Sequence, residues 1–190
     1  MSPRVWFTTT SFGLTEVQLV VRSGRASAPL ISHFTPQPAM MNVFPHPPAS
    51  AVTRILGEAG LPCSDLTAAH LERFFGCGSM GAPDGIVGLE LYESVALLRS
   101  LAVTSKCRGR GCGTALVAQA ELFAQSQGAR EIYLLTTTAE RFFERLGYAR
   151  VLREAAPVAI QRTQEFSVLC PSGSAFMLKR LPIKDVTCTT

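Results

Sequence analysis

The chain has no long apolar run and no dense run of one charge. Its longest apolar segments are strand-length, as in Val95–Leu98 and Leu101–Val103, far short of the ~20 apolar residues that a membrane-spanning helix needs. Its 18 basic and 14 acidic residues give a net charge of only +4, which does not by itself indicate a nucleic-acid partner. We therefore expect neither a membrane nor a nucleic acid among its partners.

Metal-ligand and disulfide patterns are also missing. The six cysteines form no CxxC pair, and neither they nor the three histidines show the spacing of a zinc site. We expect free thiols in a reducing compartment, the cytoplasm, and no metal. Three thiols could bind arsenic(III) or another soft metal if they converged in space, but the sequence gives no sign that three of them do.

Hydrophobic residues make up 47% of the 190-residue chain, which is enough for one packed domain. The early part of the chain differs, because six prolines crowd residues 29–48 and disfavour helices and central strands. We predict an extended, disordered N-terminal extension over residues 1–48, a folded domain over 49–182 and a tail over 183–190. Met40 and Met41 mark places where a shorter chain could start.

Periodicity predicts helices and strands after the extension. Apolar residues at helical spacing indicate helices at 49–60, 64–74, 114–127, 139–146 (with Thr138 as its cap) and 157–169. Apolar runs indicate strands at 86–92, 95–103, 131–137, 149–152 and 175–181. The glycine-rich residues 76–85 fit a strand, a loop or both. The order predicts a mixed α/β (α+β) fold with a βαβ unit at its centre.

The most informative segment is the glycine loop, Arg108-Gly109-Arg110-Gly111-Cys112-Gly113. It leads from a buried strand into an amphipathic helix, so backbone N–H groups and the helix dipole can point at one anion. Its glycines let the backbone approach oxygens closely, and its arginines add positive charge. A Walker A loop would need Gly-Lys-Ser/Thr and a dinucleotide fingerprint would need GxGxxG, and both are absent. A short RNA contact and a flexible turn with solvated arginines are the alternatives.

In its context, Arg108-x-x-Gly111-x-Gly113 after VALLRSLAV resembles the Q/R-x-x-G-x-G/A motif of the GNAT N-acetyltransferase superfamily. The likeness continues through TALVAQAELFAQSQG, EIYLLTT and AERFFERLGY. VGLELYESVALLRSLAV, YLLTTTAERFFERLGY and EFSVLCPSGSAFM are similar to the subgroup associated with arsenic resistance. The resemblance implies the GNAT acyl-CoA N-acyltransferase fold, with a central mixed twisted sheet flanked by helices, and acetyl-CoA as the acyl donor.

The resemblance also assigns residues to the donor. In that family the strand before the loop diverges from its neighbour, and its backbone binds the pantetheine arm of CoA. That role falls here to Leu101, Ala102 and Val103, and an oxyanion donor is expected on the same backbone. The pyrophosphate falls to the backbone amides of Arg108, Gly109, Arg110, Gly111, Cys112, Gly113 and Thr114. Thr136 takes the place of an asparagine that holds CoA in many relatives.

Acyl transfer to an amine needs a neutral amine, an oxyanion donor and often an acid for the leaving sulfur. Glu90 is a candidate base, because loss of water in its apolar strand favours a neutral carboxyl; a solvent-facing residue and a bridging water are the alternatives. Phe143 stands where many relatives have a tyrosine, so either the thiolate leaves without an acid or another group, such as Tyr148, serves. Tyr148 could instead pack as the aromatic after glycine. Arg99 could meet an acidic substrate group or pair with Glu90.

Together these expectations describe an N-acetyltransferase that uses acetyl-CoA to acetylate the amine of a small molecule. The subgroup indicates an arsenic-linked or xenobiotic amine, and a homodimer is an assembly that the sequence permits. One alternative is a catalytically weak acetyl-CoA-binding sensor, for which Phe143 argues. The other is an arsenite-binding protein that uses its cysteine thiols.

Overall fold

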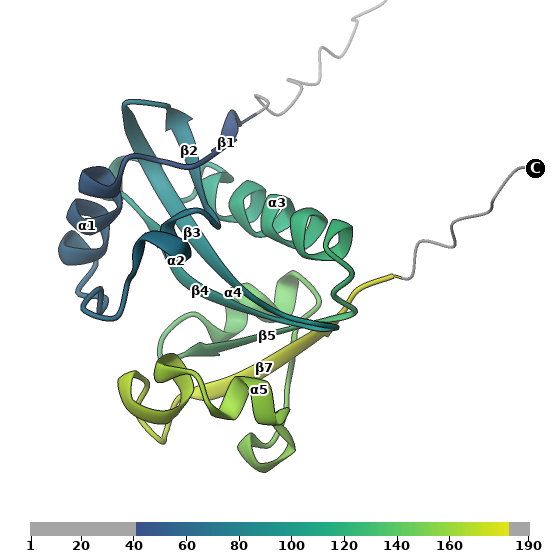
Figure 1. Cartoon of the computed structure of the whole chain (residues 1–190). Helices are drawn as coiled ribbons and strands as arrows, with labels where there is room; N and C mark the ends of the chain where they lie inside the picture. The colour runs from purple at the N-terminus through teal and green to yellow at the C-terminus, as the bar shows by residue number, and fades with distance from the viewer. Residues whose placement is uncertain (1–40, 183–190) are drawn as a thin grey trace, which may run out of the picture. The chain divides into compact units, whose positions relative to one another are not determined.

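The computed structural model describes residues 41–182, and the account below concerns these residues. They form a seven-stranded sheet with helices on both faces (Figure 1). The strand order is β1-β2-β3-β4-β5-β7-β6, in which β4 and β5 are parallel and the other neighbours are antiparallel. The predicted mixed fold, with a central mixed sheet flanked by helices, is therefore confirmed.

The strands are β1 (Val43–Pro45), β2 (Phe74–Ser79), β3 (Ala82–Tyr92), β4 (Val95–Val103), β5 (Glu131–Thr136), β6 (Ala149–Arg150) and β7 (Ala175–Arg180). The helices are α1 (Ala49–Glu58), α2 (Ala68–Leu71), α3 (Cys112–Ser126), α4 (Glu140–Arg145) and α5 (Val158–Gln161). Three short helical turns are η1 (Ser105–Cys107), η2 (Arg153–Ala155) and η3 (Glu165–Leu169), of which η3 is π-helical. No described helix is long and apolar enough to cross a membrane.

The core has one cluster on the α3 side of the sheet and two on the other side. α3 buries its apolar stripe, including Leu116 and Ala120, against inward residues of β2, β3 and β4 such as Leu98. α1 packs on the opposite face (Figure 1), and α5 covers Leu97, Tyr133 and Phe176 there. Burying one Leu or Ile side chain stabilises a fold by about 1.5–3 kcal/mol, so these helices hold β4 firmly between two layers.

The first strand corrects the predicted N-terminal boundary. β1 lies within residues 1–48, the predicted extension, yet it pairs with β2 as the edge of the sheet. Phe44 is buried, and its ring lies over Gly76, where a Cβ would come within 2.6 Å of it. The ordered domain therefore begins before residue 49. The predictions for residues 1–40 and 183–190 lie outside the described residues.

Three local predictions were wrong. The helix predicted at 64–74 shrinks to α2, while the glycine-rich residues 76–85 form part of the β2–β3 hairpin, in keeping with the prediction of a strand, a loop or both. The helix predicted at 157–169 breaks into α5 and η3 at Thr163, whose hydroxyl donates to the Ile160 carbonyl and accepts from the Phe166 N–H, in competition with helical bonds. Thr138 does not cap α4, because the Thr136 hydroxyl accepts the Ala139 N–H instead.

Candidate functional site

The site begins where β4 separates from β5. The two strands pair in parallel from Val95–Leu98 against residues 131–134. Beyond Leu98, β4 continues to Val103 with β3 as its strand partner. The backbone of residues 101–103 thus has an edge that β5 does not cover, as the GNAT resemblance implies.

A β-bulge lies at the same point. Gly88 pairs with Arg99 and Ile86 pairs with Ala102, so Ser100 and Leu101 together face Val87 alone. Ser100 has a φ of 56°, in the left-handed region that side chains other than glycine seldom adopt. Such an extra residue bends a strand and increases its twist. The bulge therefore redirects β4 just after it leaves β5.

The bulge also reverses which side chains face α3. Before it, Ala96 and Leu98 pack in the α3 cluster. After it, Leu101 and Val103 pack against that cluster, although strict alternation from Leu98 would turn Ser100 toward it. A polar Ser100 inside an apolar strand marks the place where alternation restarts.

A cavity of about 670 Å³ opens beside this backbone. Its volume falls in the range of about 300–1,000 Å³ that is typical of small-molecule sites. The walls come from the end of β4, the glycine loop, the start of α3, the α1–α2 connection and α4. It brings together eight of the eleven residues predicted to bind the cofactor, namely Leu101, Ala102, Val103, Arg108, Gly109, Gly111, Gly113 and Thr114.

The other three predicted cofactor residues lie outside the cavity lining. Arg110 is exposed, and Cys112 is buried beneath the loop with its Sγ against Gly85. Thr136 ends β5 and accepts the Ala139 N–H at 3.0 Å, so it shapes the turn into α4. A local motif places residues near a loop but does not say which of them turn inward.

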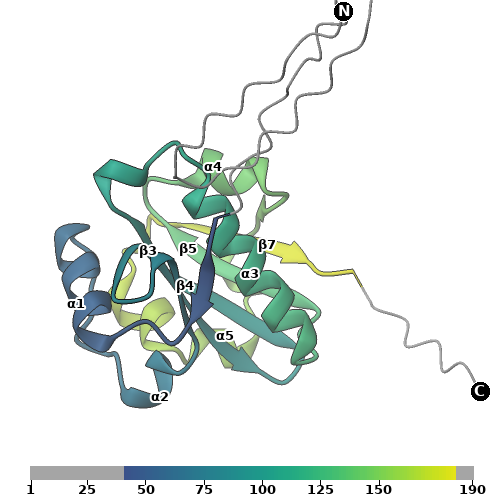
Figure 2. The ribbon, with the colours of Figure 1, turned by 90° about the horizontal axis from the view of Figure 1, so that it is seen from above.

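Helix α4 supplies two cavity residues that the sequence prediction missed, Phe142 and Arg145. Figure 2 shows α4 beside the start of α3. The Phe142 ring lies 3.4 Å from the position of a Cβ on Gly113, so the two helices meet closely at that glycine. The only signal for Arg145 in the sequence was its place in the segment AERFFERLGY.

The glycine loop has the geometry of an anion site. Gly109 and Gly111 have φ values of 74° and 89°, and a Cβ on either would meet no heavy atom within 4 Å. Gly111 is the N-cap of the 15-residue α3, whose first N–H groups and dipole favour negative charge in front of them. Arg108 donates from Nε to the Val103 carbonyl at 3.3 Å, which holds its cationic side chain beside the cavity.

The two predicted proton-transfer residues do not line the cavity. Glu90 is buried and accepts hydrogen bonds from Arg99, at 2.6 Å, and from the Tyr92 hydroxyl. The Arg99–Glu90 ion pair is thus present, and the solvent-facing alternative for Glu90 is wrong. Tyr148 packs against Phe143 with ring centroids 5.5 Å apart, and burial and nearby Glu121 raise the pKa of its hydroxyl. The geometry supports a packing role for Tyr148.

Arg99 is the centre of a cluster that the sequence revealed only in part. Besides Glu90, its guanidinium contacts Asp65 Oδ2 at 2.5 Å and Glu165 Oε2 at 3.1 Å. Burial raises the pKa of Glu165, and the Arg99 charge opposes that rise. Asp65 and Glu165 are remote from Arg99 in the sequence, and no local pattern could have paired them with it.

The thiols of Cys77, Cys107 and Cys112 lie near one another and near Asp84, below the glycine loop. Loss of water raises the pKa of Cys107 and Cys112, which favours the protonated form of both thiols. All five cysteines in the described part of the chain are free thiols. Within residues 41–182 no group of three or more His, Cys, Asp or Glu side chains is arranged to hold a metal ion.

Comparison with known proteins agrees with this geometry. Residues 66–150 match the profile of the acetyltransferase (GNAT) domain family. N-acetylglutamate synthase from Neisseria gonorrhoeae, solved with coenzyme A and N-acetyl-glutamate, superposes with a TM-score of 0.66 at 17% identity, over 77% of this chain and 36% of the synthase. The described residues have the GNAT fold.

Two further comparisons give a relative in sequence and a relative in structure. An uncharacterized N-acetyltransferase from Chlorobaculum tepidum is 34% identical over 94 residues, which are 49% of this chain and 60% of that relative. A Mycobacterium tuberculosis protein, solved in complex with CoA, superposes with a TM-score of 0.62 at 19% identity, over 74% of this chain and 99% of its own. The chain thus spans about 60% of the length of this curated relative.

Proposed function

We propose that the GNAT domain is an acyltransferase that uses acetyl-CoA to acetylate the amine of a small molecule. The observation that carries the proposal is one cavity that joins the uncovered backbone of residues 101–103 to the glycine loop. The structural relatives from N. gonorrhoeae and M. tuberculosis, both solved with CoA, support it.

The residues present fit CoA. The loop offers open space above two left-handed glycines and the positive end of α3, which suits a pyrophosphate. The uncovered edge of β4 can bind the amides of a pantetheine arm as a strand binds a strand. Apolar side chains of Leu101, Phe142 and Leu146 complete the wall around the less polar part of the arm.

Acetyl-CoA supplies a thioester, and a neutral amine attacks its carbonyl carbon while the CoA thiolate leaves. The chain's part in this reaction is to bind the donor and to donate backbone N–H groups of residues 101–103 to the developing oxyanion. The described cavity lining contains no carboxyl, imidazole or phenol. We infer that water takes the proton from the amine, and that the thiolate leaves without a side-chain acid, in keeping with Phe143.

The acceptor that we propose is a xenobiotic or arsenic-linked amine, such as an amino-acid-like organoarsenical. The likeness of three sequence segments to the arsenic-resistance subgroup supports this choice. We also propose a reducing location, the cytoplasm, which the five free thiols support. Homodimer formation stays a prediction.

The test combines binding and turnover. Calorimetry should show that acetyl-CoA binds to the full chain. Incubation with acetyl-CoA and a panel of amines should release CoA. The released CoA is measured by mass spectrometry, because the chain's own thiols interfere with thiol dyes. Absence of acetyl-CoA binding would refute the proposal. Tight binding without turnover on a broad panel would instead favour the acetyl-CoA sensor. Loss of arsenite tolerance on Cys-to-Ser substitution, with turnover intact, would favour the thiol-based alternative.

A further inference from the structure

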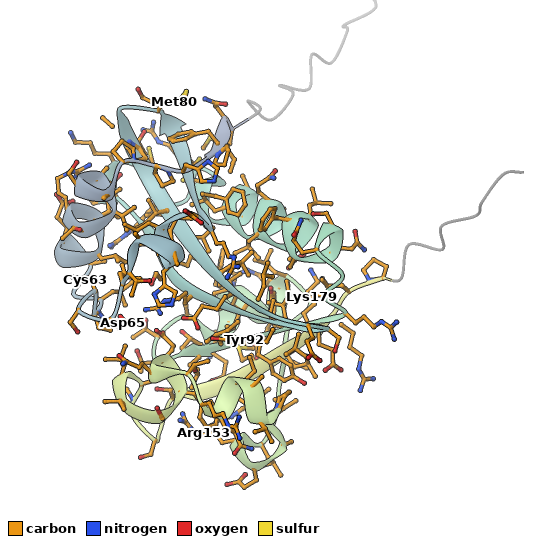
Figure 3. The ribbon with its side chains drawn as sticks, in the orientation of Figure 1. Cys63, Asp65, Met80, Tyr92, Arg153 and Lys179 are labelled. Atoms are coloured by element: carbon orange, nitrogen blue, oxygen red, sulfur yellow. The ribbon has the colours of Figure 1, made fainter. Side chains whose placement is uncertain are left out.

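The ion-pair cluster around Arg99 has no part in the proposed acyl transfer and calls for its own explanation. The Arg99 side chain is only 1% exposed, and those of Asp65 and Glu165 are 3% and 12% exposed. The three carboxylates come from the α1–α2 connection, β3 and η3, so one guanidinium joins three separate segments to β4. Figure 3 labels Asp65 in that connection and Tyr92 at the end of β3.

Stability alone does not account for the cluster. Taking charges out of water is costly, and well-packed apolar residues often replace a buried ion pair without loss of stability. The charges here do not even balance, since three carboxylates face one guanidinium. Asp65 Oδ1 and Arg99 Nη2 are buried without a well-aligned hydrogen bond. Because burying these unbalanced charges costs free energy, a role in positioning the segments that they join explains the cluster better than stability does.

Arg99 directly precedes the bulge. Its Nε lies 3.3 Å from the Ser100 hydroxyl oxygen, and Ser100 holds the left-handed φ of 56°. A strained backbone of this kind persists only where its surroundings hold it. On the far side of the bulge, the pairing of Val103 with Gly85 and the hydrogen bond from Thr104 N–H to the Asp84 carbonyl fix the strand. The Arg99 cluster is the anchor on the near side.

We propose that Arg99 is a positioning residue for the acyl donor. Held by Asp65, Glu90 and Glu165, it fixes the bulge and thereby sets the direction of the backbone at residues 101–103, which binds the pantetheine arm. This inference rests on the proposed function, in which acetyl-CoA is the donor. Arg99 itself lies outside the cavity lining and acts through the strand.

The substitution Arg99→Lys tests this role, because it keeps the charge and loses the planar fork that contacts several carboxylates at once. Two probes separate the parts of the donor: acetyl-CoA, and 3′-phospho-ADP, the nucleotide part of CoA without the pantetheine arm. Acetyl-CoA should bind about tenfold more weakly to the variant, the equivalent of about one hydrogen bond. The nucleotide, which needs only the glycine loop, should bind as it does to the wild type.

A matched control is Lys179→Met, which removes the 2.7 Å ion pair between Lys179 and Glu121 away from the cavity. It should leave both affinities unchanged even if it lowers the melting temperature as much as Arg99→Lys does. If Arg99 has a merely structural role, the Arg99→Lys variant should lose affinity for both probes together or for neither. Either of those results in a folded Arg99→Lys protein would overturn the inference.

A milder variant covers the case in which Arg99→Lys does not fold. Glu165→Gln removes one carboxylate and keeps a side chain of the same size, so acetyl-CoA affinity should fall while nucleotide affinity stays constant. Wild-type affinity for acetyl-CoA in that variant would then overturn the inference. If the wild type binds the nucleotide but not acetyl-CoA, the proposed function fails and the inference fails with it. The ratio of acetyl-CoA affinity to nucleotide affinity has no value in that case, so this outcome is distinct from an unchanged ratio in the variants.

Discussion

Gly111→Glu is the substitution that probes the proposed donor site most directly. Gly111 lines the cavity, serves as the N-cap of α3 and has a φ of 89°. A Cβ at this position meets no heavy atom within 4 Å. A glutamate therefore fits without a steric clash in the free protein, and it places its bulk and charge where the pyrophosphate is proposed to bind.

The expected effect has two separable parts. The left-handed backbone costs a residue other than glycine about 1–2 kcal/mol, and this lowers the free energy of unfolding. Repulsion between a carboxylate and a phosphate about 4 Å apart costs about 1 kcal/mol in bulk water and about 4 kcal/mol near a protein surface. Acetyl-CoA affinity should therefore fall by about 5- to 1,000-fold.

Gly128→Glu is the matched control. Gly128 follows α3, has a φ of 90°, and also offers open space around a Cβ, but it lies outside the cavity. Thermal unfolding should show a similar loss of stability in both variants, while calorimetry should show loss of acetyl-CoA affinity in Gly111→Glu alone. Unchanged affinity in Gly111→Glu, or an equal loss in Gly128→Glu, would falsify the assignment of the loop.

Three further predictions concern single side chains. Arg145→Gln should weaken acetyl-CoA binding by about two- to fivefold in calorimetry, because it removes one exposed cation beside a phosphate. Arg141 is exposed on the same helix but lies outside the cavity, so Arg141→Gln should leave the affinity unchanged. Ser100→Val should lower the free energy of unfolding by about 1–3 kcal/mol, and Ser100→Gly should preserve it, because φ is 56° there. Burial raises the pKa of Glu165, so its stabilising contribution is present at low pH and lost as pH rises through that pKa. Melting temperatures should accordingly show the wild type losing stability relative to Glu165→Gln as pH rises, and the opposite slope would contradict the burial argument.

The central strands and the glycine loop were predictable because their signals are local. VALLRSLAV is apolar enough to be a buried strand, and β4 has the predicted bounds of residues 95–103. The helix after the loop was predicted to begin at Thr114, and α3 begins two residues earlier because Gly111 serves as its N-cap. Most residues predicted to bind the cofactor line one cavity, because a short loop between a strand and a helix can adopt few conformations.

The remaining features depend on contacts between distant parts of the chain. β1 pairs with β2, and the Phe44 ring packs over Gly76, which has no side chain. The proline content of residues 29–48 could not reveal this contact between distant residues. Asp65 and Glu165 reach Arg99 only after the sheet has brought the α1–α2 connection and η3 together. The prediction of Glu90 as a base considered its burial and could not weigh the partners that occupy both of its oxygens.

The restart of alternation at Ser100 has a consequence for how the sequence of β4 tolerates change. Although β4 is one strand of nine residues, it consists of two short segments that obey opposite inside–outside rules. Even-numbered positions face α3 before the bulge, and odd-numbered positions face it afterwards. Deleting Ser100 would remove the extra residue and the bend, yet plain alternation from Leu98 would then place Leu101 and Val103 on the α3 face and Ala102 on the other, where they already lie. The extra residue therefore sets the direction of the backbone at residues 101–103, and the identity of the buried side chains does not depend on it.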